Sequence, residues 1–135
     1  MTELEKLQAI EDIRQLKMRY FRFVDAKDWA GLTDVFSKEA VFGTAQVRGN
    51  GEIVKMIRDA TEGVQTVHHG HCQEVWIESA DRASGTTAFE DRGYRKGTID
   101  LVMHGFGRYE EVYHRENGEW RILVTKISRM SVLPT

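Results

Sequence analysis

The hydrophobic pattern of this chain changes its period once, and that change limits the possible folds more than any other feature. Up to about residue 63 apolar residues recur every three or four positions, which is typical of amphipathic helices. From about residue 67 they alternate with polar residues, which is typical of strands. The pattern therefore predicts helices followed by a long antiparallel meander, an α+β fold with the helices on one face of a curved sheet.

Local signals set the expected bounds of these elements. Thr2-Glu3-Leu4-Glu5 has the spacing of a capping box, so the first helix is expected to begin there and to end near Ala26. Asp28 can cap a second helix, and the residues before Gly63 predict a third. The expected ranges are 29–36 and about 53–63 for these two helices, 40–42 for a short strand, and 67–79, 83–95, 101–115 and 119–133 for four long strands.

Asn117-Gly118 predicts a tight hairpin between the last two strands. This pair favours a type I′ turn, in which both central residues have positive φ. Counting outward from the turn, the register places Arg129 near Phe106, and Tyr109 near Lys126.

Composition excludes several classes of protein. The 135 residues are expected to form one domain, residues 1–135, with a formal charge of -2 and no basic run that would suit nucleic acid. Cys72 is the only cysteine, so no internal disulfide can form, which fits a reducing compartment. No segment is apolar enough to span a bilayer, and we expect a cytoplasmic protein with no membrane partner.

A few polar residues interrupt the apolar pattern. Lys17 and Tyr20 lie within the apolar stripe of the first helix, and Asp25 lies at its end. A carboxylate there gains nothing from the helix dipole, so Asp25 faces water or has a partner elsewhere. Asp91 among apolar strand residues, and Arg129 in the last strand, raise the same question.

His68, His69 and His71 open the first long strand, and three interpretations stay open. The histidines could simply lie on the surface at a strand edge. An imidazole beside a carboxylate suits general acid–base chemistry, because it titrates near neutral pH. Alternatively, His69 and His71 could bind a metal with Glu74 and a third ligand from His104 or His114. The alternation leaves open which imidazole faces inward; a bulge near Gly70 would turn His68 to the inside.

One longer pattern spans nearly the whole chain. It comprises Ile10-Glu11, Leu16-Lys17, Tyr20-Phe21-Arg22, Asp25, Trp29, His68, Gly70-His71, Glu74, Ala83-Ser84-Gly85, Glu90-Asp91-Arg92, Asn117-Gly118 and Trp120. This pattern resembles the SnoaL-like branch of the nuclear-transport-factor-2-like superfamily, in particular its bile-acid and scytalone dehydratases and, more distantly, a hexachlorocyclohexane dehydrochlorinase. The resemblance implies a cone-shaped barrel, a strongly bent and mostly antiparallel sheet wrapped around the long first helix.

The resemblance implies a dehydratase that needs no cofactor and no metal. Its substrate would be a hydrophobic, polycyclic, steroid-like or terpenoid-like small molecule that loses water next to a carbonyl group. The implied catalytic residues are Tyr20, Asp25, His68, Asp91 and Arg129. His68 would be the general base, with Asp91 on its other nitrogen and Asp25 as the competing partner. Tyr20 would hydrogen-bond the carbonyl or protonate the leaving hydroxyl, and Arg129 would bind an anionic group.

The resemblance and the apolar character of the chain also predict the pocket. Its expected binding residues are Lys17, Phe21, Val24, Phe42, His71, Phe89, Phe106 and Ile127, with Trp29 and Trp76 as further walls. Lys17 would lower the pKa of Tyr20 or simply reach solvent. One departure is Gly43-Thr44, which stands where the bile-acid enzyme has a pocket tyrosine.

A homo-oligomer, trimer or dimer, is implied through the outer face of the sheet. Tyr109, Tyr113 and Trp120 are candidates for that face, although they could also be covered within one chain. Isomerases, cyclases and non-catalytic binding proteins share the same fold and stay as alternatives.

Overall fold

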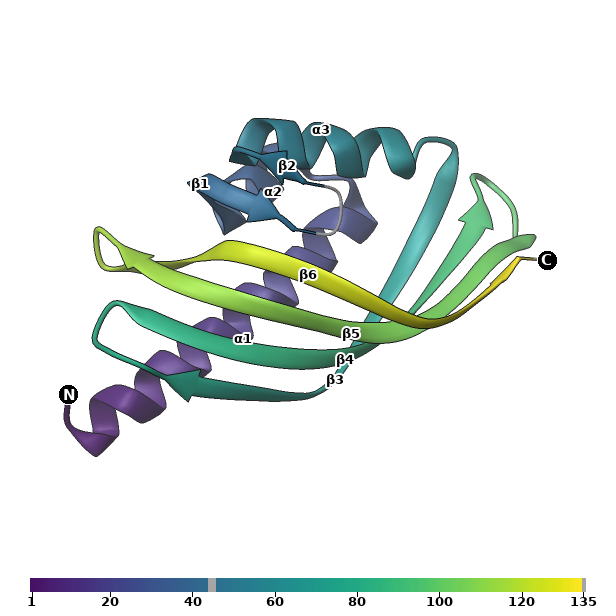
Figure 1. Ribbon diagram of the computed structural model, residues 1–135. Coiled ribbons are helices and arrows are strands. Elements are labelled where there is room, and N and C mark those ends of the chain that lie inside the picture. The colour runs from purple at the N-terminus through teal and green to yellow at the C-terminus, as the bar shows by residue number, and fades with distance from the viewer. Residues whose placement is uncertain (44–45, 135) are drawn as a thin grey trace.

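The computed structural model describes residues 1–43 and 46–134, with side chains to residue 131. The elements are α1 (Glu3–Ala26), α2 (Trp29–Val35), β1 (Phe36–Phe42), β2 (Val47–Arg48), α3 (Asn50–Ala60), β3 (Val64–Ile77), β4 (Arg82–Arg95), β5 (Leu101–Glu116) and β6 (Glu119–Pro134). Figure 1 shows β3 to β6 as long, bent strands with α1 running across one face of them. No helix in these ranges has the length and apolar composition that crossing a bilayer requires.

The sheet has six strands in the order β2-β1-β6-β5-β4-β3. β1 pairs with β6 in parallel, and the other neighbours are antiparallel. This arrangement confirms the predicted α+β class and the bent sheet around the first helix. The sheet is open within the described residues, because β2 and β3 form its two edges and do not pair with each other.

The predicted helix caps are present. Thr2 Oγ1 accepts a hydrogen bond from the Glu5 backbone N–H (3.1 Å), and Glu5 Oε2 accepts one from the Thr2 backbone N–H (2.7 Å). Asp28 caps α2 by accepting from the Gly31 N–H at 2.9 Å. The first two helices therefore begin where the sequence predicts.

Several bounds differ from the prediction. α2 ends at Val35, so that Phe36 already begins β1, and the predicted strand over 40–42 is longer at its N-terminal end. α3 spans Asn50–Ala60 and begins about three residues earlier than predicted. Thr44, where the sequence departs from its dehydratase relatives, lies outside the described residues.

The hairpin turn is as predicted, but the register beyond it is not. Asn117 and Gly118 both have positive φ, 51° and 80°. Tyr113 then pairs with Ile122 and Val112 with Val124, so Leu123 is an extra residue in β6. Because of this bulge, Arg129 pairs with Gly107 instead of Phe106, and Tyr109 with Ile127 instead of Lys126.

The three aromatic residues proposed for an outer interface lie inside the chain. Tyr109, Tyr113 and Trp120 are only 2%, 0% and 6% exposed. Tyr109 and Tyr113 belong to the alternate positions of β5 that face α1, where the whole core lies. The prediction of these residues as an exposed surface is therefore wrong, and their burial inside one chain is the alternative that holds.

Candidate active site

Four predicted site residues come together from four elements. Asp25 lies in the last turn of α1, His68 on β3, Asp91 on β4 and Arg129 on β6. His68 and Asp91 are direct partners across the β3–β4 pair. The sheet order therefore brings residues that are distant in sequence to the end of α1 where Asp25 lies.

Asp25 and His68 form the tightest side-chain contact of this group. His68 Nδ1 is 2.6 Å from Asp25 Oδ1, and the His68 backbone N–H donates to Oδ2 at 3.0 Å. The Thr66 hydroxyl donates to Oδ1 at 2.9 Å. These donors are the partners of the carboxylate at the end of the helix. Asp25 in turn holds one nitrogen of the His68 imidazole ring in place.

Asp91 pairs with Arg129 rather than with His68. Arg129 Nη1 and Nη2 donate to the two oxygens of Asp91 at 3.3 and 3.1 Å, a forked ion pair. His68 Nε2 is 3.8 Å from Asp91 Oδ2, too long for a hydrogen bond. The geometry thus favours Asp25, the competing partner, over Asp91 as the carboxylate beside the imidazole, and Asp91 holds the guanidinium instead.

Two glycines leave space at this ion pair and at the neighbouring Phe89 ring, and the sequence analysis did not single out either of them. Gly105 lies opposite Asp91, and a Cβ there would come within 2.5 Å of Asp91 Oδ1 and 2.6 Å of Arg129 Nη1. Gly107 lies opposite Phe89, and a Cβ there would come within 2.9 Å of that ring. Glycine at alternate positions of an interior strand is the signal that could have found them.

Phe21 covers the imidazole. The rings of Phe21 and His68 are nearly parallel, with an angle of 18° and centroids 5.5 Å apart. Gly70 leaves the space for this contact, because a Cβ there would lie 2.6 Å from Phe21 Cε2. The side chain of His68 is consequently 9% exposed, whereas that of Asp25 is 26% exposed.

A bulge in β3 explains which histidine faces inward. The register with β4 shifts between His71 and Glu74, and Cys72 has a positive φ of 41°. His68 faces inward before the bulge, and Gln73 does so after it, where its amide donates to the Tyr113 hydroxyl. The bulge that would turn His68 inward was expected near Gly70, and it lies just beyond that residue.

Tyr20 and Lys17 are buried behind this group. Tyr20 packs edge-on against Phe21 and Tyr109, with centroids 5.4 and 5.7 Å away. Burial raises the pKa of Tyr20 well above 10, so its phenol stays neutral and can donate a hydrogen bond. Lys17 does not reach solvent: its Nζ lies 3.0 Å from Glu111 Oε1, and both side chains are fully buried.

The predicted pocket residues divide between the two sides of the sheet. Phe89 lies on the inner face, where the Arg129 guanidinium is 5.4 Å from its ring centroid. The prediction that His71, Phe106 and Trp76 line the pocket is wrong. His71 is exposed, Phe106 packs against His104 on the outer face with the rings tilted by 47°, and Trp76 is 51% exposed. The remaining predicted wall residues, buried or half-buried, are Val24, Trp29, Phe42 and Ile127.

The other histidines do not gather as a metal site. His104 Nε2 bonds Glu90 Oε2 at 2.7 Å, and His69 Nδ1 lies 3.7 Å from Glu90 Oε1. The His104 hydrogen bond lowers the pKa of Glu90. Within residues 1–43 and 46–131 no three or more His, Cys, Asp or Glu side chains are arranged to hold a metal ion. The geometry therefore does not support the metal-binding interpretation.

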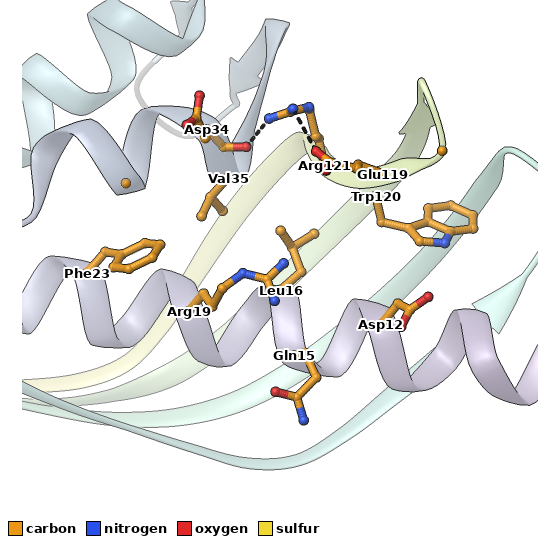
Figure 2. Close-up of a pocket in the computed structure, with 12 residues that line it drawn as sticks. Asp12, Gln15, Leu16, Arg19, Phe23, Asp34, Val35, Glu119, Trp120 and Arg121 are labelled. Carbon is orange, nitrogen blue, oxygen red and sulfur yellow. Dashed lines mark hydrogen bonds and ion pairs between the residues drawn. The ribbon is translucent and has the colours of Figure 1, made fainter.

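A large cavity of about 730 Å³ lies elsewhere, between α1, α2 and the β5–β6 hairpin. Figure 2 shows Leu16, Arg19 and Phe23 along one side of it and Trp120 on the other, and Arg121 donates to the Asp34 carbonyl at its rim. At 3.6 residues per turn, these α1 residues lie opposite the side of the helix that carries Phe21 and Asp25. The cavity is thus separate from the candidate active site.

One family model matches this chain, and several solved structures share its fold. The family model of the SnoaL-like domain matches residues 5–126. The structure is similar to that of hexachlorocyclohexane dehydrochlorinase type 2 (TM-score 0.86, 17% identity, 99% of this chain and 93% of that one). It is also similar to that of a proposed scytalone dehydratase from Novosphingobium aromaticivorans (TM-score 0.87, 12% identity, 99% and 92%). A proposed aromatic ring hydroxylase from the same organism is a further neighbour (TM-score 0.78, 22% identity, 93% and 94%).

At these identities the structural likeness concerns the fold, a helix-wrapped bent sheet of the nuclear-transport-factor-2-like kind. The family match covers most of the chain independently of that likeness. The chain therefore belongs to the SnoaL-like domain family.

Proposed function

We propose that this protein is a cofactor-free lyase, which eliminates a small leaving group from a hydrophobic molecule by general acid–base catalysis. The observation that carries the proposal is the 2.6 Å contact between Asp25 and His68, shielded by Phe21. Two structural neighbours support it, since a dehydrochlorinase and a dehydratase are, by their names, enzymes of elimination.

The contact to Asp25 determines which nitrogen acts as the base. Asp25 accepts the Nδ1 hydrogen, so that Nε2 of His68 carries the free lone pair. Nε2 takes a proton from a carbon atom of the substrate, and the electron pair of that C–H bond becomes the new double bond. The leaving group departs with its own electron pair from the adjacent carbon. The Asp25 carboxylate stabilises the imidazolium that results.

Tyr20 and Arg129 would bind the oxygen atoms of the substrate. A neutral Tyr20 hydroxyl can donate to a carbonyl oxygen as negative charge develops there. The Arg129 side chain is 40% exposed, so its guanidinium can bind an anionic or carbonyl group while it holds Asp91. When the leaving group is hydroxide, the imidazolium or Tyr20 supplies the proton that turns it into water.

The test is elimination by wild type and His68→Ala on two kinds of probe. One is a β-hydroxy ketone on a polycyclic skeleton, followed by absorbance of the conjugated product, and the other is a chlorinated cyclohexane, followed by chloride release. We expect His68→Ala to lower turnover roughly 10²- to 10⁴-fold. His114→Ala is the matched control, because His114 lies at the far end of β5 and its side chain is 41% exposed. Full activity in His68→Ala would show that the base is another residue.

Product analysis separates the alternatives within this fold. An isomerase shares the first proton transfer, but it returns the proton to another carbon and releases no leaving group. A carrier binds a probe without changing it, and Asp25→Asn would then leave its affinity unaltered. A substrate that is steroid-like or terpenoid-like is part of this proposal.

We also propose that the chain is a single domain and assembles as a dimer or trimer through the outer sheet face. Trp76, Val112 and Val124 line a hollow of about 510 Å³ on that face. Trp76→Glu should shift the mass measured by light scattering toward the monomer. Action in the cytoplasm stays a prediction.

A further inference from the structure

A second charged pair lies in the core, and the elimination mechanism does not use it. Lys17 Nζ is 3.0 Å from Glu111 Oε1, and both side chains are 0% exposed. Glu111 also accepts hydrogen bonds from the Tyr113 hydroxyl at 3.2 Å and the Thr125 hydroxyl at 2.8 Å. Because desolvation offsets most of the attraction within such a pair, a gain in stability does not explain it.

The ammonium group lies against three aromatic rings. Its distance to the ring centroid is 3.4 Å for Tyr109, 4.0 Å for Tyr20 and 4.9 Å for Phe21. We call these three rings the aromatic layer. Within the described residues Nζ forms no hydrogen bond of good geometry, so the ring faces supply its remaining favourable contacts.

The aromatic layer connects the buried ammonium to the candidate active site. Phe21 stacks on the imidazole of His68, and Tyr20 packs edge-on against Phe21. The Tyr20 and Tyr109 phenols are also hydrogen-bond partners, and their ring centroids lie 5.7 Å apart.

We propose that Lys17 is a positioning residue, whose ammonium fixes the rings of Tyr20 and Tyr109 and strengthens the hydrogen bond that Tyr20 donates to the substrate oxygen. A cation over the face of a phenol withdraws electron density from the ring, and this makes the O–H group a better donor. Glu111 keeps the ammonium over the rings. The inference rests on the proposed function of Tyr20.

The charge on Lys17 depends on pH in an accessible range. Burial lowers its pKa to about 8, although the negative charge of Glu111 opposes this shift. The titratable groups that face it are Tyr20 on α1 and Tyr109 and Glu111 on β5. The phenols have pKa values raised by burial, so Lys17 loses its proton before they do. The polarisation of the aromatic layer is therefore lost as the pH rises through about 8.

The first test needs no substrate. Protein labelled with ¹³C at the tyrosine ζ carbon is titrated by NMR from about pH 6 to 10, and Tyr20→Phe and Tyr109→Phe assign the two signals. We expect both signals to shift with an inflection near pH 8 in wild type. The double variant Lys17→Met/Glu111→Gln removes both charges and should lose the inflection. Flat signals in wild type, or an inflection that persists in the double variant, would overturn the inference.

The second test measures turnover of the elimination probe. We expect the double variant to lower kcat about tenfold with little change in KM. In a Tyr20→Phe background, the double variant should not lower kcat any further. Equal losses in both backgrounds would show that Lys17 does not act through Tyr20. The exposed pair Lys6→Met/Glu3→Gln, 3.3 Å apart on the same helix, is the control and should have no effect. If wild type turns over no probe, the proposed function fails, while the NMR result still decides the role of Lys17.

Discussion

The Asp25–His68 and Lys17–Glu111 contacts both join α1 to the sheet, and they differ in access to solvent. The Asp25–His68 contact lies at the C-terminal end of the helix, where the Asp25 side chain is 26% exposed. The Lys17–Glu111 pair lies two turns earlier and is fully buried. Solvent reaches the first contact, whereas the second touches only the side chains packed around it. Burial therefore separates a contact that can do chemistry from one that can only position other groups.

This difference between the two contacts is tested most directly by removing the charge of Asp25, at the solvent-exposed end of α1. Asp25→Asn takes away the carboxylate that holds Nδ1 of His68 and stabilises the imidazolium. We expect turnover of an elimination probe to fall about 10²- to 10⁴-fold while the fold persists, because the residue is partly solvated. Thr66→Val removes a single hydrogen bond to the same carboxylate and should have a much smaller effect. If the two variants were equally active, Asp25 would not be the partner of the base.

At the buried pair, the same kind of change should act on stability. Glu111→Gln leaves the Lys17 ammonium without its counter-ion in a site with no solvent, and we expect it to lower the free energy of unfolding by about 3–5 kcal/mol. Lys17→Met/Glu111→Gln leaves no unpaired charge and should lie close to wild type in urea unfolding. A double variant as unstable as the single one would mean that packing, not charge, dominates at this position.

The sequence predicts the elements well where the signals are local. The capping box at Thr2, the cap at Asp28 and the turn at Asn117-Gly118 depend on neighbouring residues, and each is found as predicted. The family pattern also carries Asp25, His68 and Asp91 onto elements that meet. Their roles in catalysis stay proposals.

What the sequence could not predict depends on bulges and on distant contacts. A single extra residue at Leu123 moves the residues of β6 from Val124 to Arg129 by one position, so counting from the turn places Arg129 beside the wrong partner. The choice between Asp25 and Asp91 as the partner of His68 depends on how α1 docks on β3. The Lys17–Glu111 pair joins the first helix to the fifth strand, and neither residue alone signals the other.

The pH dependence of the free energy of unfolding should report on the buried Lys17–Glu111 pair and not on the Asp25–His68 contact. The pKa of Lys17 is about 8 in the folded chain, against the ordinary lysine value of 10.5 in the unfolded chain, so between these values the unfolded chain binds more protons. The free energy of unfolding should therefore rise with pH over this window, by at most about 1.4 kcal/mol per pH unit from this group. Urea unfolding of wild type and of Lys17→Met/Glu111→Gln at several pH values gives the difference between them. A difference that stays constant from about pH 8 to 10.5 would contradict the shifted pKa of Lys17.

The last prediction concerns Gly105, which leaves space for the ion pair between Asp91 and Arg129. A Cβ at Gly105 would come within 2.5 Å of Asp91 Oδ1 and 2.6 Å of Arg129 Nη1, so Gly105→Ala must displace the forked ion pair. We expect a loss of about 1–3 kcal/mol in the free energy of unfolding, together with reduced turnover. Gly51→Ala is the matched control, because it lies in α3 with no atom within 4 Å of its added Cβ and should be neutral or stabilising. The ¹³C signals of Tyr20 and Tyr109 should keep their pH dependence in Gly105→Ala, since the buried pair is intact. If they changed as well, the Asp91–Arg129 ion pair and the buried Lys17–Glu111 pair would not be independent, and the division between an open and a buried part of the site would fail.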